Sequence, residues 1–394
     1  MNQETLLAWY DRFEKLVERL PGPIQKAVLG EIQPVKELFL EQRPPRILLL
    51  GSDDISRVEI VNSLFREQLV SLAEQRTLAL TSGWETFRCI GRGSLQILEG
   101  RFSGNAPLSW TSGGKDLPPD LILFLHRAGG PDEKLAAAVQ QAARIGDELE
   151  LKFQKRPAFI GVLEDAPPQP VATTGRTSQE VEFENVLRAN PAVNKIFARV
   201  ISVSRWSRFR ADGSADADDA NASYLNQLLG LLIDELPQSA RLEMARISGV
   251  KSAQKKIAQT LVKAATAISA AIGAQPIPLA DMPILTTLQS AMVAGIIYIS
   301  GGDLNLRSAV KFIGALGVNV ALAIALREAA RGTAKLLPGW GYAVSGAVAA
   351  GGTLAMGRAA TGFFIDGVSL KEARKLFRKR PPKPPKEVEK LDDK

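Results

Sequence analysis

The chain has 394 residues, 45% of them hydrophobic, so it is long enough for two or more domains with a large core. Its one cysteine, Cys89, excludes a disulfide framework and is typical of a reducing compartment, and the presence of only one histidine, His126, excludes a zinc site built from several Cys and His ligands. The net charge of the chain is +7. Residues 371–386 alone carry the same net charge, because they contain eight Lys and Arg residues and one Glu. The rest of the chain is therefore close to neutral, which argues against a broad nucleic-acid-binding face.

Residues 1–43 form a predicted N-terminal helical arm, because their apolar residues recur at spacings of three and four. From residue 44 to residue 236, short apolar runs typical of buried strands alternate with amphipathic runs typical of helices. This alternation predicts an α/β domain with a mostly parallel sheet and helices on both faces. The predicted strands are RILLLG (46–51), WETFRCI and SLQILEG (84–100, a hairpin through GRG), DLILFLHRA (120–128), AFIGVLED (158–165) and RVISVS (199–204). The predicted helical runs lie around residues 55–75, 131–152 and 178–197.

Residues 237–368 are predicted to form an all-α domain, because strand patterns vanish and Ala and Gly become frequent. Residues 336–357 carry no charge and are long enough to cross a bilayer, although small residues dominate them. Gly346 and Ala350 stand four residues apart, a spacing that favours close helix packing. Two interpretations remain open, a tightly packed soluble bundle and a helical hairpin that inserts into or lies on a membrane.

The stretch from residue 46 to residue 65 has the layout of a nucleotide-binding P-loop, with a strand, a glycine at the turn and then a helix. A working loop reads Gly-x4-Gly-Lys-Ser/Thr, in which backbone N–H groups and the lysine hold phosphate and the hydroxyl holds magnesium. Gly51 fills the first position, but Ser56, Arg57 and Val58 replace the second glycine, the lysine and the hydroxyl. A plain strand–turn–helix without any phosphate chemistry is the alternative interpretation.

From residue 46 to about residue 236, the chain resembles the Era-like, translation-factor-related GTPases. Their pattern Gly-x4-Gly-Lys-Ser-x-Leu-x-Asn-x-Leu is matched down to Asn62 and Leu64. Glu99 falls near the position of the family's metal-linked Asp, and Glu164 begins the segment that replaces the guanine-reading Asn-Lys-x-Asp motif. The resemblance implies a P-loop GTPase-like doubly wound sheet whose chemical motifs have decayed.

The resemblance implies that the degenerate P-loop no longer supports nucleotide chemistry. Gly51, Ser56 and Arg57 would form a vestigial cofactor-binding loop at which GTP binding is doubtful. No catalytic residue, metal ligand or cofactor is expected, since Val58 cannot ligate magnesium.

Residues from about 254 to 368 resemble the YcjF-type domain of unknown function, which commonly follows a GTPase domain and is membrane-associated. A proline-containing turn enters one helix, and a Pro-Gly-x-Gly turn precedes a later Gly/Ala-rich helix. The matching residues are Pro276, Pro278, Asp281, Gln289, Pro338, Gly339 and Gly341.

Residues 369–394 form a basic Pro/Lys-rich tail directly after the apolar helices. Lys and Arg side chains in such a place attract anionic cytoplasmic lipid, with about 1 kcal/mol for each residue. The candidate lipid-binding residues are Lys371, Arg374, Lys375, Arg378, Lys379 and Arg380. Four apolar side chains, Phe363, Phe364, Leu376 and Phe377, are predicted to serve as additional anchors.

The sequence therefore predicts a non-hydrolysing pseudo-GTPase that organises or regulates a membrane-associated complex on the cytoplasmic face of the inner membrane, held peripherally or by an inserted hairpin. The expected partners are anionic lipids, an active GTPase relative and further copies in a homo- or hetero-oligomer, and nucleic acid is not expected. One alternative is a divergent GTP-binding protein that acts in membrane remodelling. Another is a membrane-embedded transport or stress component.

Overall fold

The computed structural model divides by its internal contacts into two units, a sheet unit (Glu37–Gln254) and a helical unit (Met1–Lys36 with Lys255–Lys394). The four domain ranges derived from the sequence remain a prediction. The structure describes residues 11, 14–15, 17–18, 21–52, 57–69, 83–89, 91–101, 108–164, 176–203, 219–274, 281–317 and 340–378.

The sheet unit contains a six-stranded mixed sheet with the order β2-β3-β1-β6-β7-β8. All neighbouring strands are parallel except β2 and β3, which form the predicted antiparallel hairpin. Every residue of β1 is buried, as expected for a continuous apolar strand that is covered on both faces. The strands are β1 (Arg46–Gly51), β2 (Glu85–Cys89), β3 (Gly93–Glu99), β6 (Leu121–Arg127), β7 (Ala158–Glu164) and β8 (Phe197–Val203). A separate two-stranded hairpin is formed by β4 (Thr111–Ser112) and β5 (Lys115–Asp116).

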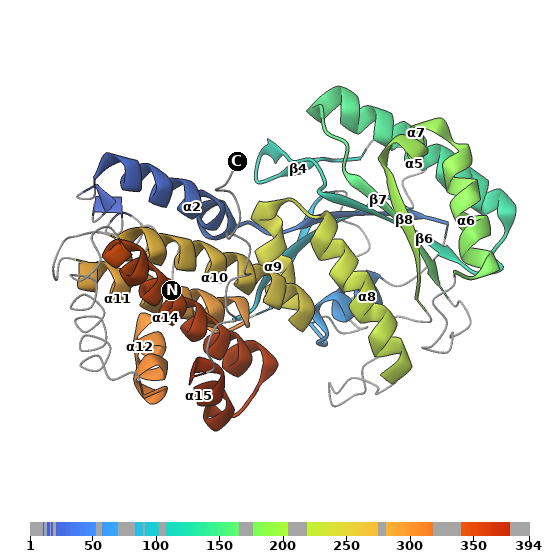
Figure 1. Cartoon of the computed structure of the whole chain (residues 1–394). Helices are drawn as coiled ribbons and strands as arrows, with labels where there is room; N and C mark the ends of the chain where they lie inside the picture. The colour runs from blue at the N-terminus through green and yellow to red at the C-terminus, as the bar shows by residue number, and fades with distance from the viewer. Residues whose placement is uncertain are drawn as a thin grey trace, which may run out of the picture. The chain divides into compact units, whose positions relative to one another are not determined.

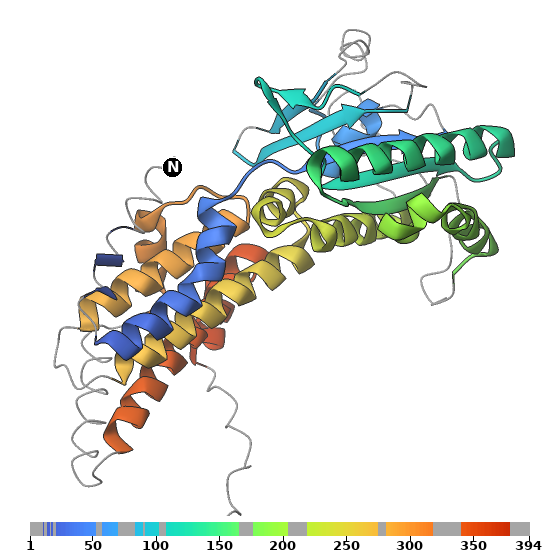
Figure 2. The same cartoon turned by 90° about the horizontal axis from the view of Figure 1, so that it is seen from above.

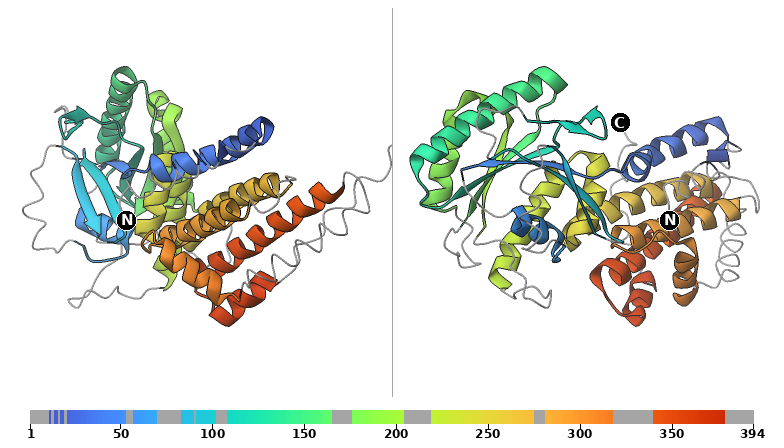
Figure 3. Two further views of the ribbon diagram at one scale, coloured as in Figure 1. Left: turned by 90° about the vertical axis from the view of Figure 1, so that its left-hand side faces the viewer. Right: turned by 180° about the vertical axis from the view of Figure 1, so that it is seen from behind.

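Helices cover both faces of this sheet (Figure 1 and Figure 3). Leu48 and Phe124 belong to the core on one face, where α5 (Asp132–Phe153), α6 (Ser178–Ala189) and α7 (Pro191–Ile196) pack. The other face carries α3 (Arg57–Phe65), α8 (Asp219–Glu235) and α9 (Gln238–Ser248).

The helical run predicted around residues 178–197 is divided in the structure between two helices and a strand. The break lies at Asn190, whose side chain accepts hydrogen bonds from the backbone N–H groups of Ala192 and Val193 and so caps α7. Pro191, the first residue of α7, lacks the N–H that would continue α6.

The predicted α/β unit with a mostly parallel sheet and the predicted helical region after it are both present. The strand order changes direction around β1, because β3 and β6 lie on opposite sides of it. In open α/β sheets, ligands bind beyond the carboxyl ends of the strands at such a switch point. Gly51, at the carboxyl end of β1, therefore lies at the edge of the sheet where a ligand of this fold would bind.

The opposite end of β1 and β6 is held by a buried charge network. The Arg43 guanidinium donates two hydrogen bonds of 2.6 Å to the Asp120 carboxylate, and the Arg46 backbone N–H donates a third of 3.0 Å. The Arg46 guanidinium lies 3.5 Å from the same carboxylate. Burial lowers the pKa of Arg46, and Asp120 opposes that shift, so the two charges depend on each other.

Helix α9 packs against the β2–β3 hairpin through polar side chains. The Glu243 carboxylate accepts a 2.8 Å hydrogen bond from the backbone N–H of Ser94 and another from the side chain of Gln42. The Arg246 guanidinium donates a 3.1 Å bond to the backbone carbonyl of Gly91. These contacts explain why the chain remains part of the sheet unit beyond residue 236.

In the helical unit, α10 (Lys251–Gly273), α11 (Asp281–Ile299) and α14 (Trp340–Thr361) run alongside one another (Figure 2). A buried polar network joins them, since the hydroxyls of Ser269 and Thr353 lie 2.8 Å apart and the Gln289 amide donates a 3.0 Å bond to Thr353. The predicted close packing at Gly346 is confirmed, because an added Cβ would stand 2.9 Å from the carbonyl oxygen of Ala270. The unit contains most of α2 (Gly22–Leu40) and α10 (Lys251–Gly273), together with α11 (Asp281–Ile299), α12 (Leu306–Ala315), α14 (Trp340–Thr361), the π-helical turn η1 (Gly362–Asp366) and α15 (Leu370–Arg378).

Across the parts of the chain that the structure describes, no helix combines the length and the apolar character that crossing a bilayer requires.

Candidate functional site

The loop after β1 begins at Gly51, where the backbone of β6 comes very close. A Cβ at Gly51 would stand 2.0 Å from the Leu125 carbonyl oxygen, and the φ of +134° also requires glycine. The next residue, Ser52, donates its N–H to that carbonyl at 3.0 Å and places its hydroxyl 2.8 Å from Nδ1 of His126. The start of the loop is therefore joined to β6, while the predicted loop residue Ser56 lies outside the described residues.

Arg57, which stands at the position of the P-loop lysine, is paired within the sheet unit. Its guanidinium lies 3.1 Å from the Glu85 carboxylate of β2, and the exposed fractions of the two side chains are 11% and 13%. Burial raises the pKa of Glu85, and the positive charge of Arg57 lowers it. The cation that the P-loop pattern assigns to phosphate therefore already has an anionic partner.

Two further residues of the P-loop pattern serve the structure. Val58, at the position of the magnesium-binding hydroxyl, is buried in the core of the sheet unit. Asn62 uses its side-chain oxygen to accept a 3.0 Å hydrogen bond from Leu69 N–H and its backbone carbonyl to accept one from Glu67 N–H. The match at Asn62 is explained by the turn that follows α3.

Glu99, near the position of the metal-linked aspartate, is also paired. The Arg101 guanidinium donates hydrogen bonds of 2.9 and 2.8 Å to the two carboxylate oxygens, in the two-pronged arrangement that makes such pairs strong. The Arg101 backbone N–H adds a third bond of 3.1 Å. Among the described residues, no group of three or more His, Cys, Asp and Glu side chains is placed to hold a metal ion.

Glu164, at the position of the guanine-reading asparagine, is buried at the end of β7. Its backbone carbonyl accepts a 2.8 Å hydrogen bond from Ala128 N–H. Residues 165–175, which include the rest of the base-reading segment, lie outside the described residues, so the predicted loss of guanine selectivity remains a prediction.

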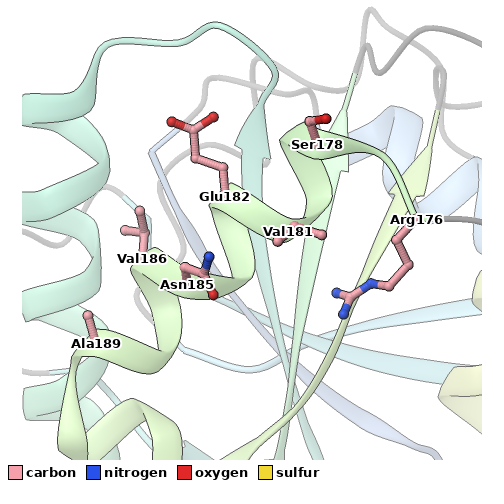
Figure 4. Close-up of a pocket in the computed structure, with 7 residues that line it drawn as sticks. All are labelled: Arg176, Ser178, Val181, Glu182, Asn185, Val186 and Ala189. Carbon is pink, nitrogen blue, oxygen red and sulfur yellow. The ribbon is translucent and has the colours of Figure 1, made fainter.

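An open depression of about 620 Å³ lies on the outer side of α6 (Figure 4). The exposed valines Val181 and Val186 border it, and the sequence analysis did not single them out. The sequence does contain a sign of them, since both valines are apolar residues on the polar side of an amphipathic helix. The lining residues are Arg176, Ser178, Val181, Glu182, Asn185, Val186 and Ala189.

Four of the six predicted lipid-binding residues lie on α15, and Lys379 and Arg380 lie outside the described residues. The helix begins with a reciprocal cap, in which the Ser369 N–H and hydroxyl each donate a 2.9 Å bond to the Glu372 carboxylate. The Glu372 N–H donates a 3.3 Å bond back to the Ser369 hydroxyl. These bonds lower the pKa of Glu372, and the charge of Lys375 lowers it further. Lys371, Arg374, Lys375 and Arg378 are all exposed to solvent.

Three of the four predicted apolar anchors, Phe363, Phe364 and Leu376, pack within the helical unit. The rings of Phe363 and Phe364 are 5.2 and 4.9 Å from that of Phe312, measured between centroids. Leu376 lies against η1, because a Cβ on Gly362 would stand 2.7 Å from its Cδ1 atom.

No known family model matches the sequence, and no curated protein matches it. One similar solved structure comes from the chloroplast translocon components atToc33 and psToc159, for whose GTPase activity dimerisation is important. It aligns with 53% of this chain and 93% of its own length at 16% sequence identity, with a TM-score of 0.27. At this identity and TM-score, the likeness says nothing about the function of this chain.

Proposed function

We propose that the chain is a pseudo-GTPase, a GTPase-like protein that binds partners and does not turn over nucleotide. The observation that carries this proposal is the ion pair between Arg57 and Glu85, since it occupies the cation that stands at the position of the P-loop lysine. The pairing of Glu99 with Arg101 supports the proposal at the metal-binding position.

The free energy needed to break these ion pairs opposes phosphate binding at the loop. Separating a largely buried ion pair leaves an uncompensated charge and costs about 3–5 kcal/mol. To bind Arg57, a phosphate group would have to separate Arg57 from Glu85, and this cost would weaken phosphate binding by about 100-fold to several-thousand-fold. With Val58 buried at the hydroxyl position, the loop also lacks the ligand through which magnesium would offset the phosphate charge.

We also propose that the sheet unit is an Era-like relative and that residues 254–368 form a YcjF-type domain, on the strength of the motifs described above. In this proposal the protein organises a membrane-associated complex at an anionic cytoplasmic membrane surface, together with an active GTPase relative or further copies of itself. The exposed Lys and Arg residues of α15 support the membrane surface as the location.

The purified full-length chain is expected to show no magnesium-dependent release of phosphate from GTP or ATP above the background rate, because its phosphate-position cation and metal-position carboxylate are both paired. A sensitive phosphate-release assay with and without magnesium measures this. The double variant Arg57→Gln/Glu85→Gln is the control, since it removes both charges together and leaves no buried carboxylate unpaired. Turnover by the natural chain that the double variant lacks would establish a divergent GTPase instead.

Replacing Glu85 by glutamine is expected to release Arg57 and to strengthen binding of pyrophosphate by about 100-fold or more, because the anion no longer competes with an internal carboxylate. Isothermal titration calorimetry measures the affinity. Glu67→Gln is the matched control, since Glu67 pairs with Arg92 at an exposed position. Because burial raises the pKa of Glu85, moderate acid should have the same effect on the natural chain. A folded Glu85→Gln variant that binds pyrophosphate no better than the control would show that the ion pair does not silence the site.

A further inference from the structure

The exposed side of α15 carries a stripe of cations. Lys371, Lys375 and Arg378 are separated by four and three residues, a spacing that places them on one side of a helix. All three are exposed, whereas Ala373 on the other side of the helix is fully buried. We call these three residues the cationic stripe.

Arg374 does not belong to the cationic stripe, although the sequence groups it with the others. Its Nε donates a 2.8 Å hydrogen bond to the carbonyl oxygen of Ala315, the last residue of α12. This bond satisfies a carbonyl at a helix end and directs the guanidinium toward α12. Arg374 therefore stabilises the docking of α15.

The apolar side of α15 is used for packing within the helical unit. Ala373 is buried, and Leu376 lies against Gly362 of η1. Inserting this side into hydrocarbon would first require α15 to detach and to break the bond between Arg374 and Ala315. In the folded structure, α15 therefore presents its positive charges to a partner.

We propose that the cationic stripe binds the headgroups of an anionic lipid surface by charge alone, while the apolar side of α15 stays packed on the helical unit. This inference rests on the membrane location in the proposed function and names the residues and the mode of attachment. Charge complementarity identifies the partner, and the near-neutral remainder of the chain lacks the extended basic footprint of a nucleic-acid-binding protein.

The size of the effect follows from the charges. One cation near an anionic surface strengthens binding about fivefold, so the three residues together contribute about 100-fold. The attraction between exposed charges is screened over about 8 Å at physiological salt and about 3 Å at 1 M salt, whereas apolar insertion is not screened. Attachment through the cationic stripe is therefore reversible by salt.

The test is flotation of the full-length chain with vesicles of neutral phosphatidylcholine, alone or mixed with anionic phosphatidylglycerol. Lys371→Gln/Lys375→Gln/Arg378→Gln should lose about 100-fold in partitioning onto anionic vesicles and keep the circular dichroism spectrum of the natural chain. The matched control, Lys383→Gln/Lys386→Gln/Lys390→Gln, removes the same charge from outside the stripe and should lose clearly less. The natural chain should leave the vesicles in 1 M salt.

The outcomes separate the inference from the proposed function. If the natural chain stays off anionic vesicles even at low salt, the proposed membrane location fails and the inference fails with it. If it binds but resists 1 M salt, or if both triple variants lose binding equally, only the charge-based attachment through the stripe is overturned. Tighter stripe-dependent binding to a DNA duplex than to anionic vesicles at equal salt would overturn the choice of lipid as partner.

Discussion

Replacing Asp120 by alanine is expected to lower the free energy of unfolding of the sheet unit by about 3–5 kcal/mol, because it leaves a buried charge without its partner. The Asp120 side chain is 4% exposed and binds two guanidinium groups and one backbone N–H. Without it, Arg46 would keep a cation that burial already disfavours, as the lowered pKa of Arg46 indicates. Urea unfolding, combined with hydrogen exchange of the β1 and β6 amides, measures the loss.

Asp116→Ala is the matched control for this prediction. Asp116 also forms a short ion pair, at 2.7 Å with Lys152, but both side chains are exposed. Solvent screens such a pair, so its removal should change stability little. An Asp120→Ala variant as stable as Asp116→Ala would show that the network adds nothing to the sheet.

Replacing Gly51 by alanine is expected to cost more than about 4 kcal/mol, enough to leave the sheet unit unfolded or misfolded under ordinary conditions. The new methyl group would stand 2.0 Å from a backbone oxygen of Leu125, which belongs to the paired strand β6 and cannot move as a flexible side chain would. The φ of +134° adds strain for any residue with a Cβ. Thermal unfolding followed by circular dichroism measures the change.

Gly91→Ala provides the comparison for this second prediction. Gly91 also has a positive φ, +78°, but a Cβ there would meet nothing within 4 Å. Only the backbone strain remains, so a loss of about 1–2 kcal/mol is expected. If the two variants melt at similar temperatures, the close approach of β6 is not what requires glycine at position 51.

This second prediction bears on how the opening motif of the sequence is interpreted. A glycine at position 51 matches the first residue of a P-loop, yet the structure gives it a reason that needs no nucleotide, namely the approach of the β6 backbone. Asn62 likewise matches the family pattern and holds the turn after α3. Both residues would therefore be needed by the fold even if the loop bound no phosphate.

The sequence by itself determined the strands of the six-stranded sheet and the change to a helical region, because burial on both faces produces a continuous apolar run, as in β1. It did not predict the short hairpin of β4 and β5. It also located the degenerate loop and the basic segment. It could not determine the partners of charged residues, since Arg57 and Glu85 stand 28 positions apart and meet only in the folded sheet unit. Nor could it separate Arg374 from the cationic stripe or assign Gln289 to the network with Thr353. Periodicity reports which side of an element is buried, whereas pairing depends on which elements the tertiary structure brings together.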